Sequence, residues 1–207
     1  MSKHYNAGHV FGRISAPPTE TKSKEGKGAP YLRLKINCYH PETGNVQAYG
    51  NLWGRKKIDE CIAAYKKDPR QTFKFSGFFS QAPEEEEGKE RYSNFTFIGM
   101  ETLDEAKPRA VFVLVGTVSR LEEDKLSIHL SREMKPKEDG EEPRVQEEDF
   151  DLILLDPPAA RGIMVGDVVE AKGKLRAKEG EDEYGGNSSP IRPYVETIRP
   201  RKQETPF

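Results

Sequence analysis

The chain has 207 residues, 34% hydrophobic and 33% charged, with a formal net charge of −2. No run approaches the roughly 20 apolar residues of a membrane helix, and no apolar segment of a secretory signal follows the N-terminus, so we expect no membrane association. The two cysteines, Cys38 and Cys61, form no Cys-x-x-Cys pair, which indicates a reducing, cytoplasmic setting without a disulfide framework.

Charge is divided unevenly along the chain. Residues 1–82 contain 14 Lys and Arg residues against 6 Asp and Glu residues, a net charge of +8. The remaining residues contain 19 basic and 29 acidic residues, a net charge of −10. An asymmetry of this kind indicates that the basic part meets a polyanion, although a chance division of a near-neutral chain would look the same.

The predicted elements occur twice in the same order: three strands, a helical connection and two further strands. In the first half the strands are predicted at 9–14, 31–39, 46–53, 72–79 and 92–100, with a helix at 56–67. In the second half they are predicted at 111–118, 125–131, 149–155, 168–175 and 191–198, with a short helix-like connection at 158–165. Both first strands contain a glycine with apolar residues around it, as a curving barrel strand does.

This order is that of the five-stranded OB barrel, and its repetition strengthens the assignment. The predicted fold class is therefore all-β, with one short helix per unit, arranged as two tandem OB-fold barrels. We predict a first, nucleic-acid-binding barrel at 1–105, a second barrel at 108–200 and a C-terminal tail at 201–207. A single nine- or ten-stranded sandwich is the alternative.

Alternation sorts the side chains of the second and third strands into two faces. Apolar residues at alternate positions, such as Leu32, Leu34 and Ile36, are predicted to belong to the core. The opposite rows combine four aromatic residues, two cations and three amides. These predicted binding residues are Tyr31, Arg33, Lys35, Asn37 and Tyr39 on one strand and Gln47, Tyr49, Asn51 and Trp53 on the next.

Such a surface suits unpaired nucleic-acid bases. Aromatic rings stack on bases at roughly 1–3 kcal/mol each, whatever the base, and Arg and Lys neutralise phosphates. Amides can bond to base edges or to the backbone. The alternative is that exposed Tyr and Trp residues simply favour strands.

Further basic residues extend the predicted surface. Arg55, Lys56 and Lys57 follow Trp53 almost directly. A Gly- and Ser-containing loop between the first two strands supplies Lys22, Lys24 and Lys27. We expect this loop to close over a bound strand, although lysines in a loop can also serve solubility alone.

The second barrel departs from this composition. Its outward row is predicted to be Lys125, Ser127, His129 and Ser131, and its third strand follows an acidic Glu147-Glu148 pair and contains no Tyr or Trp. We therefore expect a degenerate barrel that serves dimerisation or partner binding.

The segment from Gly8 to Leu103 resembles the bacterial-type single-stranded DNA-binding protein family. The resemblance is carried by 10–14 in the first strand, by the alternating strand 31–39, by 51–55 before the helix and by 75–79 around Gly77. Two such units in one chain are similar to the tandem members of the family, and divergence of this degree would fit a phage or mobile-element variant. The resemblance implies a homodimer of four barrels that coats single-stranded DNA in replication, recombination or repair.

The C-terminus adds a second point of resemblance, because members of that family commonly end in Pro-Phe. This chain ends in Pro206 and Phe207, which the resemblance implies to be a partner-binding tip for replication and repair enzymes. Only one acidic residue precedes them closely, in contrast to the acidic tip of the family.

Catalysis finds little support in the sequence. The four histidines lack metal-ligand spacing, and neither a phosphate-binding loop nor a nucleophile elbow is present. We predict a non-enzymatic protein without cofactors that binds single-stranded DNA. An RNA-binding OB protein and a protein-assembly adaptor remain as alternatives.

Overall fold

The computed structural model describes residues 4–22, 29–39, 46–82, 91–134, 144–177 and 191–201. These residues form two compact units. The first contains the described residues of 7–112 and of 174–192, and the second contains those of 4–6, 113–173 and 193–201. The predicted functional division between 1–105 and 108–200 stays a prediction.

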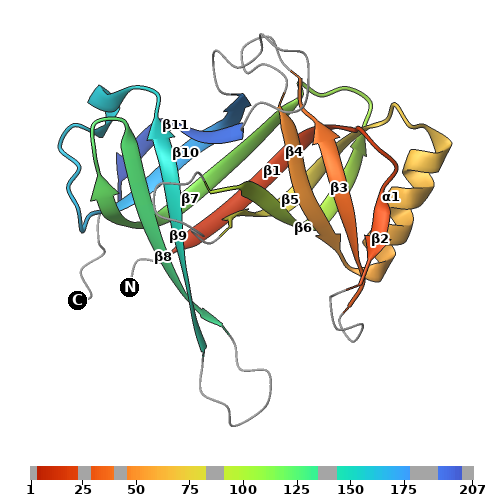
Figure 1. Ribbon diagram of the computed structural model, residues 1–207, viewed down its shortest axis with the longest axis horizontal. Coiled ribbons are helices and arrows are strands. Elements are labelled where there is room, and N and C mark those ends of the chain that lie inside the picture. The colour runs from red at the N-terminus through yellow and green to blue at the C-terminus, as the bar shows by residue number, and fades with distance from the viewer. Residues whose placement is uncertain are drawn as a thin grey trace. The chain divides into compact units, whose positions relative to one another are not determined.

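The first unit is built on a closed ring of five strands (Figure 1). The ring runs in the order β1 (Tyr5–Ile14), β3 (Tyr31–Asn37), β4 (Gln47–Trp53), β6 (Ser93–Leu103) and β5 (Thr72–Gln81), which pairs again with β1. All of these pairs are antiparallel except β4 with β6. A short strand that the sequence did not reveal, β2 (Thr19–Thr21), pairs with residues 31–33 of β3, beyond the two residues of β3 that pair with β1.

A second ring of strands, most of whose residues belong to the second unit, repeats this order. This ring runs β7 (Arg109–Leu121), β8 (Lys125–Met134), β9 (Arg144–Leu154), β11 (Ile191–Pro200) and β10 (Val168–Ala177), which pairs again with β7. The third and fifth strands, β9 and β11, are again parallel. The repeated closed ring confirms the predicted OB-fold class, and the sandwich alternative is wrong.

Two glycines show how closely the repeats correspond. A Cβ atom built on Gly12 of β1 would lie 2.3 Å from the carbonyl oxygen of Asn37, and one on Gly116 of β7 would lie 2.5 Å from that of His129. The next nearest atom to this added Cβ belongs to the side chain of Ile36 in the first barrel and of Ile128 in the second. Each isoleucine directly precedes the residue whose carbonyl is contacted. Only glycine allows the first strand to approach the second this closely.

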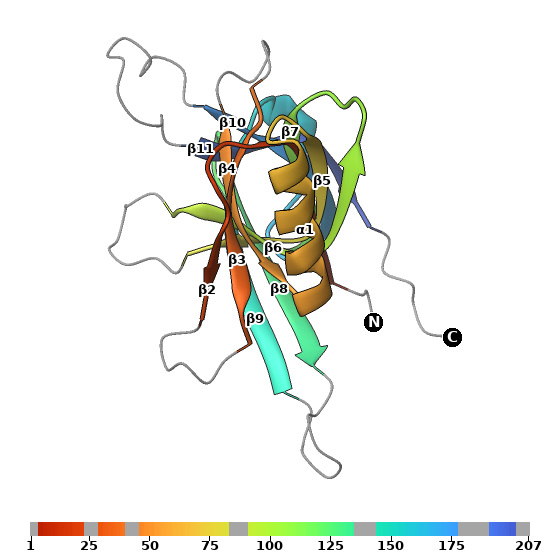
Figure 2. The same cartoon turned by 90° about the vertical axis from the view of Figure 1, so that its right-hand side faces the viewer.

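The helix α1 (Arg55–Lys67) joins β4 to β5 and packs against β3, β4 and β6 (Figure 2). It buries Ile58 and Cys61, and its last turn carries two lysines, which suits the negative end of the helix dipole. The corresponding connection in the second unit is one turn of 3-10 helix, η1 (Pro157–Ala160). Within the described ranges, no helix has both the length and the apolar character that crossing a bilayer requires.

The core of the first unit is a continuous row of phenylalanine rings. Neighbouring ring centroids along the row lie between 4.8 and 5.7 Å apart. The row consists of Phe73, Phe75, Phe97, Phe95, Phe79 and Phe112. The first five of these side chains are fully buried, which confirms the predicted inward face of β5 and β6.

Candidate nucleic-acid interface

The outer face of β3 and β4 brings the predicted residues together in directly opposed pairs. The inward residues Leu32, Leu34 and Ile36 are buried as predicted, and the residues between them are half-buried or exposed. Because opposed residues of two antiparallel strands share a face, the register defines four cross-strand pairs. They are Tyr31 with Trp53, Arg33 with Asn51, Lys35 with Tyr49, and Asn37 with Gln47.

Aromatic rings occur in two of these pairs. The rings of Tyr31 and Trp53 contact one another, with centroids 4.9 Å apart and planes inclined by 32°. Two pairs further along, the ammonium group of Lys35 lies 5.8 Å from the centroid of the Tyr49 ring. Successive pairs are about 7 Å apart along the strands, so the two aromatic positions are about 14 Å apart. The pair of Arg33 with Asn51 lies between them.

The remaining aromatic residue, Tyr39, lies just beyond the end of β3 and is 58% exposed. Its backbone N–H donates to the Asn37 side chain at 3.0 Å. The Tyr49 hydroxyl likewise donates to Gln47 at 3.5 Å. Two of the three amides are therefore held by local hydrogen bonds at one end of the face.

The cations differ in whether a carboxylate accompanies them. Arg33 and Lys35 on the face, and Lys56 and Lys22 beside it, make no ion pair with another described residue. Lys57, in contrast, is paired with Glu60 at 3.0 Å. Arg33 and Lys35 are therefore available to an anionic ligand, whereas Lys57 is already neutralised by Glu60.

Arg55 lies between two carboxylates. Its Nε and Nη2 atoms contact the two carboxylate oxygens of Asp59 at 3.2 and 2.9 Å, and its Nη1 atom donates to Glu20 at 2.9 Å. The hydrogen bond to Asp59, with the charges of Asp59 and Glu20, raises the pKa of this guanidinium above its ordinary value. Its predicted role as a phosphate contact stays untested, and its surroundings disfavour it.

Sequence reasoning missed one feature of the face and one exposed aromatic residue elsewhere in the barrel. The edge strand β2 places Thr19 opposite Arg33 and Thr21 opposite Tyr31, and a strand of three residues has no periodicity to reveal it. Tyr92, on the hairpin of β5 and β6, is 83% exposed. In an alternating strand Tyr92 falls on the side opposite the buried Phe95 and Phe97. This alternation could have indicated from the sequence that Tyr92 is exposed.

Some predicted binding residues lie outside the described residues. They are Lys24, Lys27, Pro206 and Phe207. Their assignments stay predictions.

The equivalent face of the second barrel has a different chemistry. His129 and Ser127 of β8 oppose Asp149 and Asp151 of β9. The Ser127 hydroxyl donates to Asp151 at 2.7 Å, and Nδ1 of His129 lies 2.9 Å from Asp149. Carboxylates therefore occupy the positions that Gln47 and Tyr49 hold in the first barrel.

No group of three or more His, Cys, Asp or Glu side chains within the described ranges is arranged to hold a metal ion. Cys38 and Cys61 are buried and unpaired, and burial raises the pKa of each thiol to about 12. The outer face of β3 and β4 can stack on planar groups and neutralise anions.

Comparisons with known proteins identify the fold. No family model matches the chain, and no curated protein matches it. Among solved structures, it is similar to the wild-type single-stranded DNA binding protein from Thermus aquaticus, with a TM-score of 0.59 and 14% identity, covering 100% of this chain and 97% of that one. A deletion mutant of the same protein gives a TM-score of 0.59 at 12% identity, with coverage of 100% and 98%.

Proposed function

We propose that the chain binds single-stranded DNA through the outer face of β3 and β4, largely independently of sequence. The observation that carries this proposal is the register of these strands. It alternates aromatic pairs with a cationic pair on one exposed face, with Tyr31 and Trp53 at one end and Lys35 and Tyr49 further along. Stacking and phosphate neutralisation are the two interactions that such binding requires.

A single strand fits this face better than a duplex does. Aromatic rings on an open sheet can stack only on bases that are not already paired and stacked. Arg33 lies between the two aromatic positions and would meet a phosphate while neighbouring bases stack on either side. The solved structures of similar fold belong to a protein named for binding single-stranded DNA, which supports the same choice.

The finer parts of the proposal concern how the protein is used. We propose that it coats and protects single strands during replication, recombination or repair in the cytoplasm, and that it acts as a homodimer. The C-terminal residues Pro206 and Phe207 would recruit replication and repair proteins. The second barrel would serve dimerisation or partner binding, since its equivalent face has carboxylates at the positions that Gln47 and Tyr49 hold in the first barrel.

Trp53 makes the proposal directly testable, because it is the only tryptophan in the chain. Its fluorescence is titrated with an oligo-dT strand at low and high salt, and with DNA duplex and RNA of equal length. We expect strong quenching by the DNA strand that weakens with salt, and none by the duplex. Equal quenching by RNA would move the conclusion to an RNA-binding protein.

A matched variant separates the face from the rest of the surface. Tyr49→Ala removes one aromatic ring of the face, whereas Tyr5→Ala removes an exposed ring from β1. We expect Tyr49→Ala to weaken binding and Tyr5→Ala to leave it unchanged. A wild-type protein that responds to no nucleic acid at low salt refutes the proposal and leaves the protein-adaptor alternative.

A further inference from the structure

The edge strand β2 extends the face of β3 and β4, and its placement rests on few contacts. It has three residues, which pair with Arg33, Leu32 and Tyr31 of β3. Short edge strands are marginal unless other contacts hold them. The ion pair between Glu20 at the centre of β2 and Arg55 at the start of α1 is such a contact.

The side chains of β2 alternate between two faces of the sheet. Thr19 and Thr21 oppose Arg33 and Tyr31 and therefore share the outer face with them. Glu20 opposes the buried Leu32 and points to the other side. On that side the Glu20 carboxylate accepts a hydrogen bond from Nη1 of Arg55.

Arg55 is itself fixed from within α1. Asp59, four residues further along the helix, accepts from the guanidinium with both carboxylate oxygens. A two-point contact of this kind orients the planar guanidinium. The remaining Nη1 donor then reaches Glu20, so β2 is connected through Arg55 to the helix.

The charge of this cluster argues against phosphate binding by Arg55. Two carboxylates surround one guanidinium, so the cluster carries more negative than positive charge. A phosphate would have to displace a carboxylate that already occupies the donors. Arg33 and Lys35 carry no such partner among the described residues.

We propose that Arg55 is a positioning residue of the strand-binding face rather than a phosphate ligand. By holding Glu20 it keeps β2 beside β3, which adds the hydroxyls of Thr19 and Thr21 to the surface next to Arg33 and Tyr31. Threonine hydroxyls commonly donate to phosphate oxygens. This inference rests on the proposed function and names further residues of the same face.

The salt dependence of oligo-dT binding distinguishes the two roles of Arg55. Removing one cation that neutralises a phosphate of a single strand lowers the slope of log K against log salt by about 0.7. We expect Arg55→Gln to weaken binding about two- to twelve-fold, as removal of one neutral hydrogen bond does, with the slope unchanged. Arg33→Gln lowers the slope. A slope lowered to the same extent by Arg55→Gln overturns the inference.

Glu20→Gln is a second test, in which the change of charge alone and the loss of the ion pair predict opposite changes in affinity. Removing a carboxylate favours binding of a polyanion by charge alone, yet we expect weaker binding because β2 is no longer held by the ion pair to Arg55. The control is Glu105→Gln, since Glu105 is exposed and has no ion pair within the described residues. Tighter binding by Glu20→Gln, or binding equal to that of the control, overturns the inference.

Thr19→Val completes a double-mutant cycle with Arg55→Gln, because valine keeps the shape and strand propensity of threonine. We expect Thr19→Val to weaken binding in the wild-type background and to have no further effect in Arg55→Gln. Additive effects overturn the inference while leaving the proposed function intact. Failure of the wild-type chain to bind any single strand refutes the proposed function itself, and this inference with it.

Discussion

Substitution of Trp53 by alanine removes the largest stacking surface of the proposed face. The indole ring is half-buried and contacts Tyr31 at a centroid distance of 4.9 Å. Removal of one stacked base costs about 1–3 kcal/mol, which corresponds to a dissociation constant raised about 5- to 160-fold. Tyr31 is deprived of its neighbouring ring in the same variant, so we expect the upper part of this range.

The weakened binding of Trp53→Ala should depend on salt as the binding of the wild-type protein does. Stacking releases no counterions, so Trp53→Ala should lower affinity by the same factor at every salt concentration. The slope of log K against log salt should stay that of the wild-type protein. An unchanged slope with a lowered affinity is the signature of a stacking residue, as opposed to a phosphate ligand.

The assay is the anisotropy of a labelled oligo-dT strand, because the variant has no tryptophan signal. Thermal unfolding followed by circular dichroism confirms that the barrel is intact, and Tyr5→Ala is the control for removal of an exposed ring elsewhere. An affinity decrease below two-fold in a folded variant would refute the assignment of Trp53. A changed slope would show that the residue acts through the phosphates.

Four further predictions address the charges, the barrel and its buried groups. Arg33→Gln should lower the slope of log K against log salt by about 0.7, measured by Trp53 quenching, because one phosphate is no longer neutralised by the protein. Gly12→Ala should lower the free energy of unfolding by about 1–3 kcal/mol in urea titrations, because the added Cβ meets the facing backbone. Burial and then the charge of Lys74 lower the pKa of His9, so the unfolded chain binds the proton more readily. Stability should therefore fall as the pH drops through about 6.5, and less so in His9→Gln. Burial raises the pKa of Cys38 and Cys61 to about 12, so both thiols should react slowly with DTNB at pH 8 and rapidly in urea.

The period-two alternation of the sequence predicted which side chains of each strand are buried and which are exposed. The alternation of 31–39 placed Leu32, Leu34 and Ile36 inside and the residues between them outside, and the structure confirms this division. The repeated order of elements predicted two barrels for the same reason, since each strand has its own pattern. Inward phenylalanines such as Phe95 were equally predictable.

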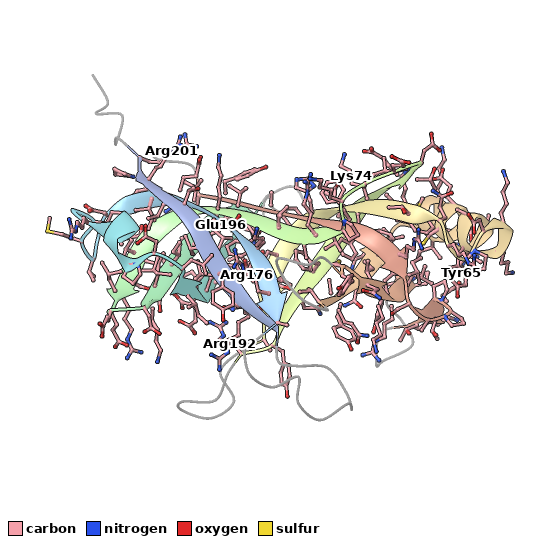
Figure 3. All side chains as sticks on the ribbon, turned by 90° about the horizontal axis from the view of Figure 1, so that it is seen from above. Tyr65, Lys74, Arg176, Arg192, Glu196 and Arg201 are labelled. Atoms are coloured by element: carbon pink, nitrogen blue, oxygen red, sulfur yellow. The ribbon has the colours of Figure 1, made fainter. Side chains whose placement is uncertain are left out.

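Contacts between distant residues could not be predicted in this way. Nothing in the sequence shows that Tyr31 opposes Trp53, because register depends on the closed ring. Glu20, one of the two partners of Arg55, lies 35 residues away in the chain. Its strand, β2, is too short to show a periodic pattern in the sequence. Lys74, labelled in Figure 3, pairs with Glu101 at 3.1 Å across β5 and β6, and no pattern in the sequence reveals that contact.

Gly12 and Gly116, at which the first strand of each barrel approaches the second closely, are residues that the fold requires and are distinct from the surface residues that would bind a ligand. At these positions the facing backbone leaves no room for another residue, whereas an exchange on the outer rows leaves the strand pairing untouched. A duplicated barrel can therefore change its ligand by a few substitutions while its architecture persists. Tyr49 in one barrel and Asp151 in the other lie at equivalent positions, so the two barrels differ in the chemistry of their surface rows while they share the glycines that the fold requires.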